Sequence, residues 1–191
     1  EGTVVDADDL MSEMIETAKS RTEELGKTDG FTEDEKAELY NTIGMGALKY
    51  FLLKVDPKKR LLFDPNESVD FQGHTGPFIQ YTHARIKSVL RKAAFETSTA
   101  LVTPASISSY ERDLIMSLGN FPIVIEASAK EFSPAQIANY VYEVAKLYNK
   151  FYHEETILKA EDESVKTFRL HLSAAAAKVI AESMRLLGVQ V

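Results

Sequence analysis

The chain changes character at Phe71-Gln-Gly-His-Thr-Gly-Pro-Phe-Ile-Gln-Tyr-Thr-His-Ala-Arg85-Ile-Lys-Ser-Val-Leu-Arg-Lys92. This stretch begins with a glycine-rich turn and continues as an amphipathic helix that mixes aromatic rings, amides and cations. No Asp or Glu occurs between Phe71 and Phe95, although the whole chain has a formal net charge of −7. The local reversal of charge marks this stretch as the first candidate for a binding surface.

The charge is distributed unevenly on either side of this stretch. Residues 1–70 carry 9 Lys and Arg against 17 Asp and Glu, whereas residues 71–191 carry 13 against 12. Proteins that bind polyanions broadly are usually basic overall. The composition therefore argues against general nucleic-acid binding, and we expect no DNA partner. An anionic partner would have to be bound by a local patch.

Composition also limits the class of protein. The chain has 191 residues, of which 45% are apolar, and no apolar run approaches the roughly 18 residues of a membrane helix. It contains no cysteine, which excludes disulfides and thiolate zinc sites and suits a reducing compartment. We expect a cytoplasmic protein without a membrane partner. Because the chain opens with Glu1 instead of Met, it resembles a cut through a longer protein.

Helix signals recur along the chain. Capping boxes, with a Ser or Thr N-cap followed three residues later by Glu or Gln, occur at Thr32, Ser108 and Ser133. The predicted helices begin near Asp6, Thr32, Asp64, Thr75 or Gly76, Ser108, Asn120, Ser133 and Asp162. Alternation typical of strands is confined to Thr3–Val5 and Leu61–Phe63. The sequence therefore predicts an all-α fold, with a helical stem over residues 1–70 and a helical bundle over residues 71–191.

Hydrophobic spacing predicts which face of each helix is buried. The predicted inner residues are Leu10, Met14, Ala18 and Leu25 in the first helix, Leu39, Ile43 and Ala47 in the second, Ile137, Val141, Val144, Tyr148 and Phe151 in the seventh, and Phe168, Leu172, Val179 and Leu186 in the last. Two glycines, Gly44 and Gly46, are predicted to allow close packing of helices, because no nucleotide-binding loop fits around them.

The sequence contains no recognisable set of catalytic residues. The four histidines lack the spacing of zinc ligands, and neither a nucleophile elbow nor a phosphate-binding loop occurs. Most carboxylates near helix starts are explained by capping. We therefore predict no catalytic residue, no metal site and no cofactor within this chain.

The sequence does indicate a binding surface. At about 100° per residue, Tyr81, Arg85, Ser88 and Lys92 share one helical stripe, with Phe78 on its flank. An opposite stripe, which we predict to face the core, contains Ile79, His83, Ile86 and Leu90. Exposed rings beside cations suit unstacked bases and phosphates of RNA, although Tyr81 is also compatible with a core position. The turn Gly73–Gly76 adds backbone donors at a helix N-terminus and is a candidate anion site.

The stretch Gly73-His-Thr-Gly-Pro-Phe-Ile-Gln-Tyr-Thr-His-Ala-Arg85 resembles the Gly-x-Thr-Gly-Pro-Tyr-Leu-Gln-Tyr-x-His-x-Arg motif of class I arginyl-tRNA synthetases. Three further collinear segments are similar to that family: Gly2–Leu10, Ile43–Phe51 and Ile137–Tyr152. The resemblance covers essentially the whole chain. It implies a C-terminal fragment with a DALR-type anticodon-binding domain, whose stem would follow the ATP signature loop of a catalytic domain.

The resemblance also implies a partner and a site. The partner would be the anticodon loop of tRNA(Arg), bound by a monomer, and the family's contact positions fall on Gly73, His74, Thr75, Gly76, Phe78 and Tyr81. Arg85 and Lys92 join them from the helical stripe. Phe78 replaces the family's usual Tyr, so stacking remains possible there but the hydroxyl is lost. ATP with Mg²⁺ would serve the full-length enzyme, and the fragment alone should not aminoacylate.

Two alternatives remain open at this point. The aromatic stripe could dock a partner helix, which would make the bundle a protein-interaction module. The bundle could also belong to another class I synthetase, such as the cysteine enzyme. Salt dependence and the choice of anticodon loop distinguish these possibilities from binding of tRNA(Arg).

Overall fold

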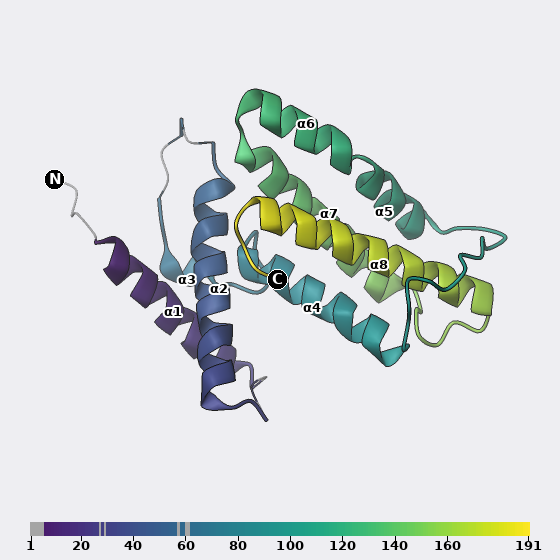
Figure 1. The fold of residues 1–191 in the computed structure, drawn as a ribbon, viewed down its shortest axis with the longest axis horizontal. Coiled ribbons are helices and arrows are strands. Elements are labelled where there is room, and N and C mark those ends of the chain that lie inside the picture. The colour runs from purple at the N-terminus through teal and green to yellow at the C-terminus, as the bar shows by residue number, and fades with distance from the viewer. Residues whose placement is uncertain (1–5, 27, 29, 57, 60–61) are drawn as a thin grey trace.

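The computed structural model describes residues 6–26, 28, 30–56, 58–59 and 62–191 (Figure 1). Its helices are α1 (Ala7–Glu24), α2 (Glu33–Leu53), α3 (Pro65–Ser68), α4 (Gly76–Lys92), α5 (Ser109–Gly119), α6 (Phe121–Glu131), α7 (Pro134–Glu154) and α8 (Glu163–Leu186). No strand occurs among the described residues, and the predicted all-α fold is confirmed. The possible strand Thr3–Val5 lies outside the described residues, as does Leu61 of the other.

The helix starts follow from local capping. At Thr32 and Ser108 both hydrogen bonds of the capping box are present, and Asp64 accepts from the backbone N–H groups that follow it. The capping box predicted at Ser133 is wrong. The side chain of Ser133 makes no capping bond, and Gln136 donates to Glu131 across 2.5 Å instead of turning back to the N-cap. The backbone of Ser133 is instead bound by α6: its N–H donates to the carbonyl oxygen of Ser128 at 3.0 Å, and its carbonyl oxygen accepts from Oγ of Ser128 at 2.7 Å.

The helices α1 and α2 cross at a glycine. A Cβ atom on Gly44 would lie 2.9 Å from both the carbonyl oxygen of Met14 and the Cα of Ile15, so only glycine permits this approach. Met14 and Ala18 of α1 are fully buried against Ile43 and Ala47 of α2 in one hydrophobic cluster. Close packing at Gly44, predicted from the sequence, is therefore confirmed.

The bundle is built around α7, which lies beside α4 and α8; α5 and α6 follow one another end to end and both pack against α7 (Figure 1). All five predicted inner residues of α7 are buried. In α8 the predicted face is partly wrong, because Leu186 is 45% exposed while Leu170, Ile180 and Met184 are buried. Since α8 contacts α4, α5 and α7, its buried face is broader than one stripe, and the pattern of large apolar residues alone did not locate it.

The stem and the bundle meet where α2 crosses α4. A Cβ atom on Gly76 would lie 2.7 Å from the carbonyl oxygen of Gly46, so the two backbones almost touch. Next to this crossing, Nε2 of Gln80 donates to the carbonyl oxygens of Thr42, at 3.1 Å, and of Gln190, at 2.8 Å. The last residues of the chain therefore lie against both α2 and α4, as Figure 1 shows.

The predicted division at residue 70 has no sharp counterpart in the packing. One hydrophobic cluster joins α1, α2 and Val69, and the other fills the bundle, but Tyr50 of α2 belongs to the bundle cluster. The boundary between stem and bundle remains a prediction. We keep the word stem for residues 6–70 and the word bundle for residues 71–191. None of the described helices has the length and apolar character needed to cross a membrane.

Candidate functional site

A groove of about 700 Å³ runs between the stem and the bundle. The stem wall consists of Thr22, Leu25, Phe31, Leu39, Thr42 and Ile43. The bundle wall consists of Phe71, Gln72, Phe78, Gln80, Tyr81, Ala84, Arg85, Asn149, His153 and Val191. Most of these side chains are apolar or aromatic, as in other binding pockets, while the polar groups come mainly from α4 and α7. Three residues of the predicted stripe, Phe78, Tyr81 and Arg85, line this groove together.

Arg85 of the groove contacts two aromatic rings and an amide side chain. Its guanidinium carbon lies 5.0 Å from the ring centroid of Tyr81 and 5.2 Å from that of Tyr152. It also donates to Oδ1 of Asn149, whose Nδ2 in turn donates to Oγ1 of Thr82 at 2.8 Å. The side chain is half-buried. The sequence predicted an outward cation, whereas the structure places Arg85 between two rings and fixes its plane.

The aromatic residues of the stripe are also half-buried. Tyr81 meets Phe71 edge to face, with ring centroids 6.4 Å apart, and Phe78 meets Tyr142 of α7 at 5.4 Å. Tyr81 and Phe78 are therefore neither core residues nor fully exposed ones. Both rings border the groove from its bundle wall. This intermediate position keeps an aromatic surface beside the groove while the neighbours hold the rings in place.

The turn before α4 is mainly structural. Thr75 is 3% exposed and is the N-cap of α4, accepting from the backbone N–H of Phe78 at 3.2 Å and donating to the carbonyl oxygen of Asp70. Gly76 is buried at the crossing with α2. Neither residue lines the groove, so any effect of these two residues on binding would be indirect, through the position of α4.

His74 lies away from the groove lining. Its ring stacks on Tyr142 with centroids 3.9 Å apart, and the carbonyl oxygen of His74 accepts from Nζ of Lys54 at 2.9 Å. Burial lowers the pKa of His74, and the positive charge of Lys54 lowers it further. The imidazole is therefore neutral at pH 7 and contributes a flat ring instead of a positive charge.

The anion site predicted at Gly73–Gly76 lacks several of the donors expected there. The backbone N–H of Thr75 donates to the carbonyl oxygen of Gly73 at 3.0 Å, and that of Gln72 donates to Oδ1 of Asp70 at 2.9 Å. Proline at position 77 has no N–H. A carboxylate, that of Asp70, already occupies this side of the turn. The prediction overlooked Asp70 because it precedes the acid-free stretch by one residue.

Lys92 is placed apart from the other predicted residues. It is exposed on the last turn of α4 and does not line the groove. Seven residues of helix separate it from Arg85, which corresponds to about 10 Å along the axis. A ligand that reaches both would have to extend along α4.

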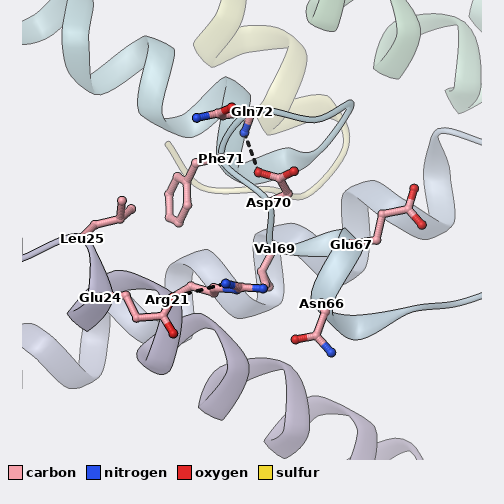
Figure 2. Close-up of a pocket in the computed structure, with 9 residues that line it drawn as sticks. All are labelled: Arg21, Glu24, Leu25, Asn66, Glu67, Val69, Asp70, Phe71 and Gln72. Carbon is pink, nitrogen blue, oxygen red and sulfur yellow. Dashed lines mark hydrogen bonds and ion pairs between the residues drawn. The ribbon is translucent and has the colours of Figure 1, made fainter.

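A second, polar groove of about 460 Å³ adjoins the first and shares Leu25, Phe71 and Gln72 with it (Figure 2). Three carboxylates line it, those of Glu24, Glu67 and Asp70, against one guanidinium, that of Arg21. Arg21 is paired with Glu24 at 3.2 Å. The surplus of negative charge makes this groove unfavourable for phosphate. Among the described residues, no group of three or more His, Asp or Glu side chains is arranged to hold a metal ion.

Several residues of the site were missed in the sequence. Asn149 and Tyr152 are three residues apart on α7, which places them on one face of the helix. That spacing is the signal in the sequence by which they could have been found. Leu25 was predicted to be an inner residue of α1 and is 48% exposed at the groove. Nothing in the local pattern indicates that the stem helices reach α4.

Comparisons with known proteins agree with this geometry. The model of the DALR anticodon binding domain matches residues 79–191. Arginine–tRNA ligases from Bacteroides fragilis and Flavobacterium psychrophilum are 54% and 53% identical over the whole chain, which covers 32% and 31% of their lengths. The solved arginyl-tRNA synthetase of Thermus thermophilus is 30% identical with a TM-score of 0.87, covering 98% of this chain and 32% of that one.

The chain spans about a third of the length of the curated relatives that it matches. The family model covers more than half of the chain, including most of α4, all of α7 and the Arg85–Asn149 contact between them. The sequence motif, the all-α fold and the relatives all lead to the same assignment. The chain belongs to the DALR anticodon binding domain family.

Proposed function

We propose that the groove between stem and bundle binds the anticodon loop of tRNA(Arg). The observation that carries this proposal is the arrangement of Arg85 between Tyr81 and Tyr152, at 5.0 and 5.2 Å, on an apolar groove. An unstacked base needs an aromatic surface, and the phosphate beside it needs a cation. The acid-free sequence of α4 provides both within one turn of helix.

In the longer protein, this chain would guide tRNA selection while other segments carry out the chemistry. The relatives are named arginine–tRNA ligases, and ATP with Mg²⁺ would serve the activation step in the full-length enzyme. The chain itself would bind RNA as a monomer in the cytoplasm, hold no cofactor and fail to aminoacylate. The groove residues would act by binding and positioning the loop.

The direct test is a titration of the chain with an arginine anticodon stem-loop. Replacing Tyr81 by Ala removes one stacking surface, which should weaken binding by about 1–3 kcal/mol. A stem-loop with the cysteine anticodon serves as the control ligand and should bind more weakly to the wild type. Equal affinity of the wild type and Tyr81→Ala for the arginine loop would contradict the proposal.

The apolar lining of the groove favours one rival, a protein-interaction module. A partner helix would bury its apolar face in the groove, and its affinity would depend little on salt. Binding of RNA should instead weaken steeply as salt rises, because phosphate contacts release counterions. Titrations at two salt concentrations therefore separate the two functions.

A further inference from the structure

The stem contributes six of the residues that line the groove, and two of them expose large apolar side chains. Leu25, the C-cap of α1, is 48% exposed, and Phe31, just before α2, is 45% exposed, although Met14 and Ala18 of α1 and Ile43 of α2 are buried. Apolar side chains that remain open to solvent along a groove are typical of binding sites. The stem wall therefore carries its own candidate contacts.

Phe31 has a defined place in the turn between α1 and α2. It directly precedes Thr32, the N-cap of α2, and its backbone N–H donates to the carbonyl oxygen of Thr28 at 3.1 Å. An apolar residue before an N-cap usually packs on the fourth residue of the helix. In α2 that residue is Lys36, whose Nζ is paired with Glu33 at 2.8 Å. The ring of Phe31 borders the groove instead.

The charges around the groove restrict what can occupy it. The adjoining polar groove carries the carboxylates of Glu24, Glu67 and Asp70, whereas the guanidinium of Arg85 lies at α4. An anionic ligand is therefore favoured only with its negative charge toward α4 and α7. An unstacked nucleobase meets this condition, since its ring is flat and uncharged and its phosphate can lie toward Arg85.

We propose that Phe31 is a base-stacking residue of the RNA site, on the stem wall of the groove that Tyr81 borders from the bundle. This inference rests on the proposed binding of an anticodon loop and adds a contact from outside the bundle. A base that enters the groove meets aromatic side chains from two segments about 50 residues apart in the sequence, Phe31 and Tyr81. The stem then takes part in recognition as well as in joining the bundle to the rest of a longer chain.

The test compares three variants of the full 191-residue chain with the wild type, using the arginine anticodon stem-loop as the probe. Phe31→Ala should raise the Kd about 5- to 150-fold, the effect of one lost base stack. Phe31→Leu keeps an apolar side chain without a π face and should also weaken binding. Phe31→Tyr keeps the ring and should retain the affinity of the wild type.

The matched control is Phe132→Ala. Phe132 is 90% exposed at the junction of α6 and α7 and does not line the groove, so its loss should leave the Kd unchanged. Thermal unfolding followed by circular dichroism checks that each variant is folded. Because Phe31 is nearly half exposed, its replacement should leave the unfolding midpoint near that of the wild type.

The outcomes separate this inference from the proposed function. If Tyr81→Ala weakens binding while Phe31→Ala and Phe31→Leu do not, the stem contact is wrong and the RNA site stands. If Tyr81→Ala, Phe31→Ala and Phe31→Leu all bind as the wild type does, both the stem contact and the proposed RNA site are wrong. If Phe31→Leu binds as the wild type does, the contact is apolar without stacking, and the inference is overturned as well.

Discussion

Arg85 shows how a single residue acquires its role from a distant segment. Its hydrogen-bond partner, Asn149, lies 64 positions further along the chain, and one of its two rings, Tyr152, lies on the same distant helix. The sequence motif identified Arg85 and Tyr81, because both belong to one helical stripe. It did not identify the partners that hold Arg85, since contacts between helices leave no local pattern.

The neutral histidines make stability depend on pH. Burial lowers the pKa of His74 and of His83, and the lysines Lys54 and Lys87 lower these values further. As pH falls through about 6.5, the unfolded chain takes up protons at these positions while the folded chain does not. The free energy of unfolding should therefore decrease as the pH drops below about 7, and level off below the folded pKa values.

Urea unfolding of the wild type at pH 7.5 and pH 5.5 measures this decrease. The double variant His74→Gln/His83→Gln cannot titrate at these positions and should lose less stability between the two pH values. An equal loss in wild type and double variant would exclude the two histidines as its source.

Arg169 of α8 joins α5 to the segment after α7 through two ion pairs. Its guanidinium bonds the carboxylates of Glu111 at 2.7 Å and Glu155 at 2.5 Å, and Glu111 is 2% exposed. Replacing Arg169 by Met leaves a buried carboxylate without its cation, which should cost about 3–5 kcal/mol of unfolding free energy. Denaturant unfolding checks this value.

The control for Arg169 is an exposed pair of the same kind. Arg185 bonds Glu182 at 2.8 Å with 70% of its side chain exposed, so Arg185→Met should cost no more than about 1 kcal/mol. Adding Glu111→Gln to Arg169→Met removes the uncompensated charge and should recover part of the loss. Similar losses for both arginines would contradict this account.

At the scale of helices, the glycine at the start of α4 controls how closely α2 approaches. A Cβ atom on Gly76 would lie 2.7 Å from a backbone oxygen, which cannot move without shifting α2. Gly76→Ala should therefore cost about 1–3 kcal/mol of unfolding free energy through overpacking.

The control is Gly119, the last residue of α5, where a Cβ atom would meet nothing within 4 Å. Gly119→Ala should be neutral or stabilising by up to about 1 kcal/mol. Thermal unfolding of both variants would contradict this view if Gly76→Ala melted no earlier than Gly119→Ala.

The sequence predicted where the helices begin better than it predicted which of their faces are buried. N-caps and prolines act within one turn, so the starts of α2, α4 and α5 are encoded locally. The buried face of α8 depends on three neighbouring helices, and Leu186 was therefore assigned to the wrong side. The capping box at Ser133 was predicted wrongly for a related reason, because the turn from α6 determines the backbone conformation of Ser133.

For the whole molecule, the excess of negative charge means that attraction of RNA must come from a few cations. Lys92 is exposed at the end of α4 and is predicted to meet a phosphate. Lys92→Ala should weaken binding at low salt and reduce the slope of log Kd against log salt by about 0.7, the value for one phosphate of a single strand. Lys130→Ala, an exposed change on α6, is the control and should leave the slope unchanged. An unaltered slope in Lys92→Ala would remove Lys92 from the site.

The groove itself could not be predicted from the sequence. Its walls come from α1 and its C-cap, the turn before α2, α2, Phe71 and Gln72, α4, α7 and the last residue of the chain. No single window of sequence contains more than a part of them. The stripe on α4 predicted only part of the bundle wall, Phe78, Tyr81 and Arg85, because these three residues lie on one helix. The other wall arises only when α2 crosses α4 at Gly46 and Gly76.

Tyr50 links the crossing of α2 and α4 to the way in which the molecule unfolds. It belongs to α2, yet it is fully buried in the cluster of the bundle, and its hydroxyl donates to the carbonyl oxygen of Ala138 at 2.8 Å. A piece beginning at residue 71 would therefore carry a hole the size of a tyrosine and an unfilled acceptor on α7. Stem and bundle should melt in a single cooperative transition, so the unit that folds is larger than the unit that the family motif delimits.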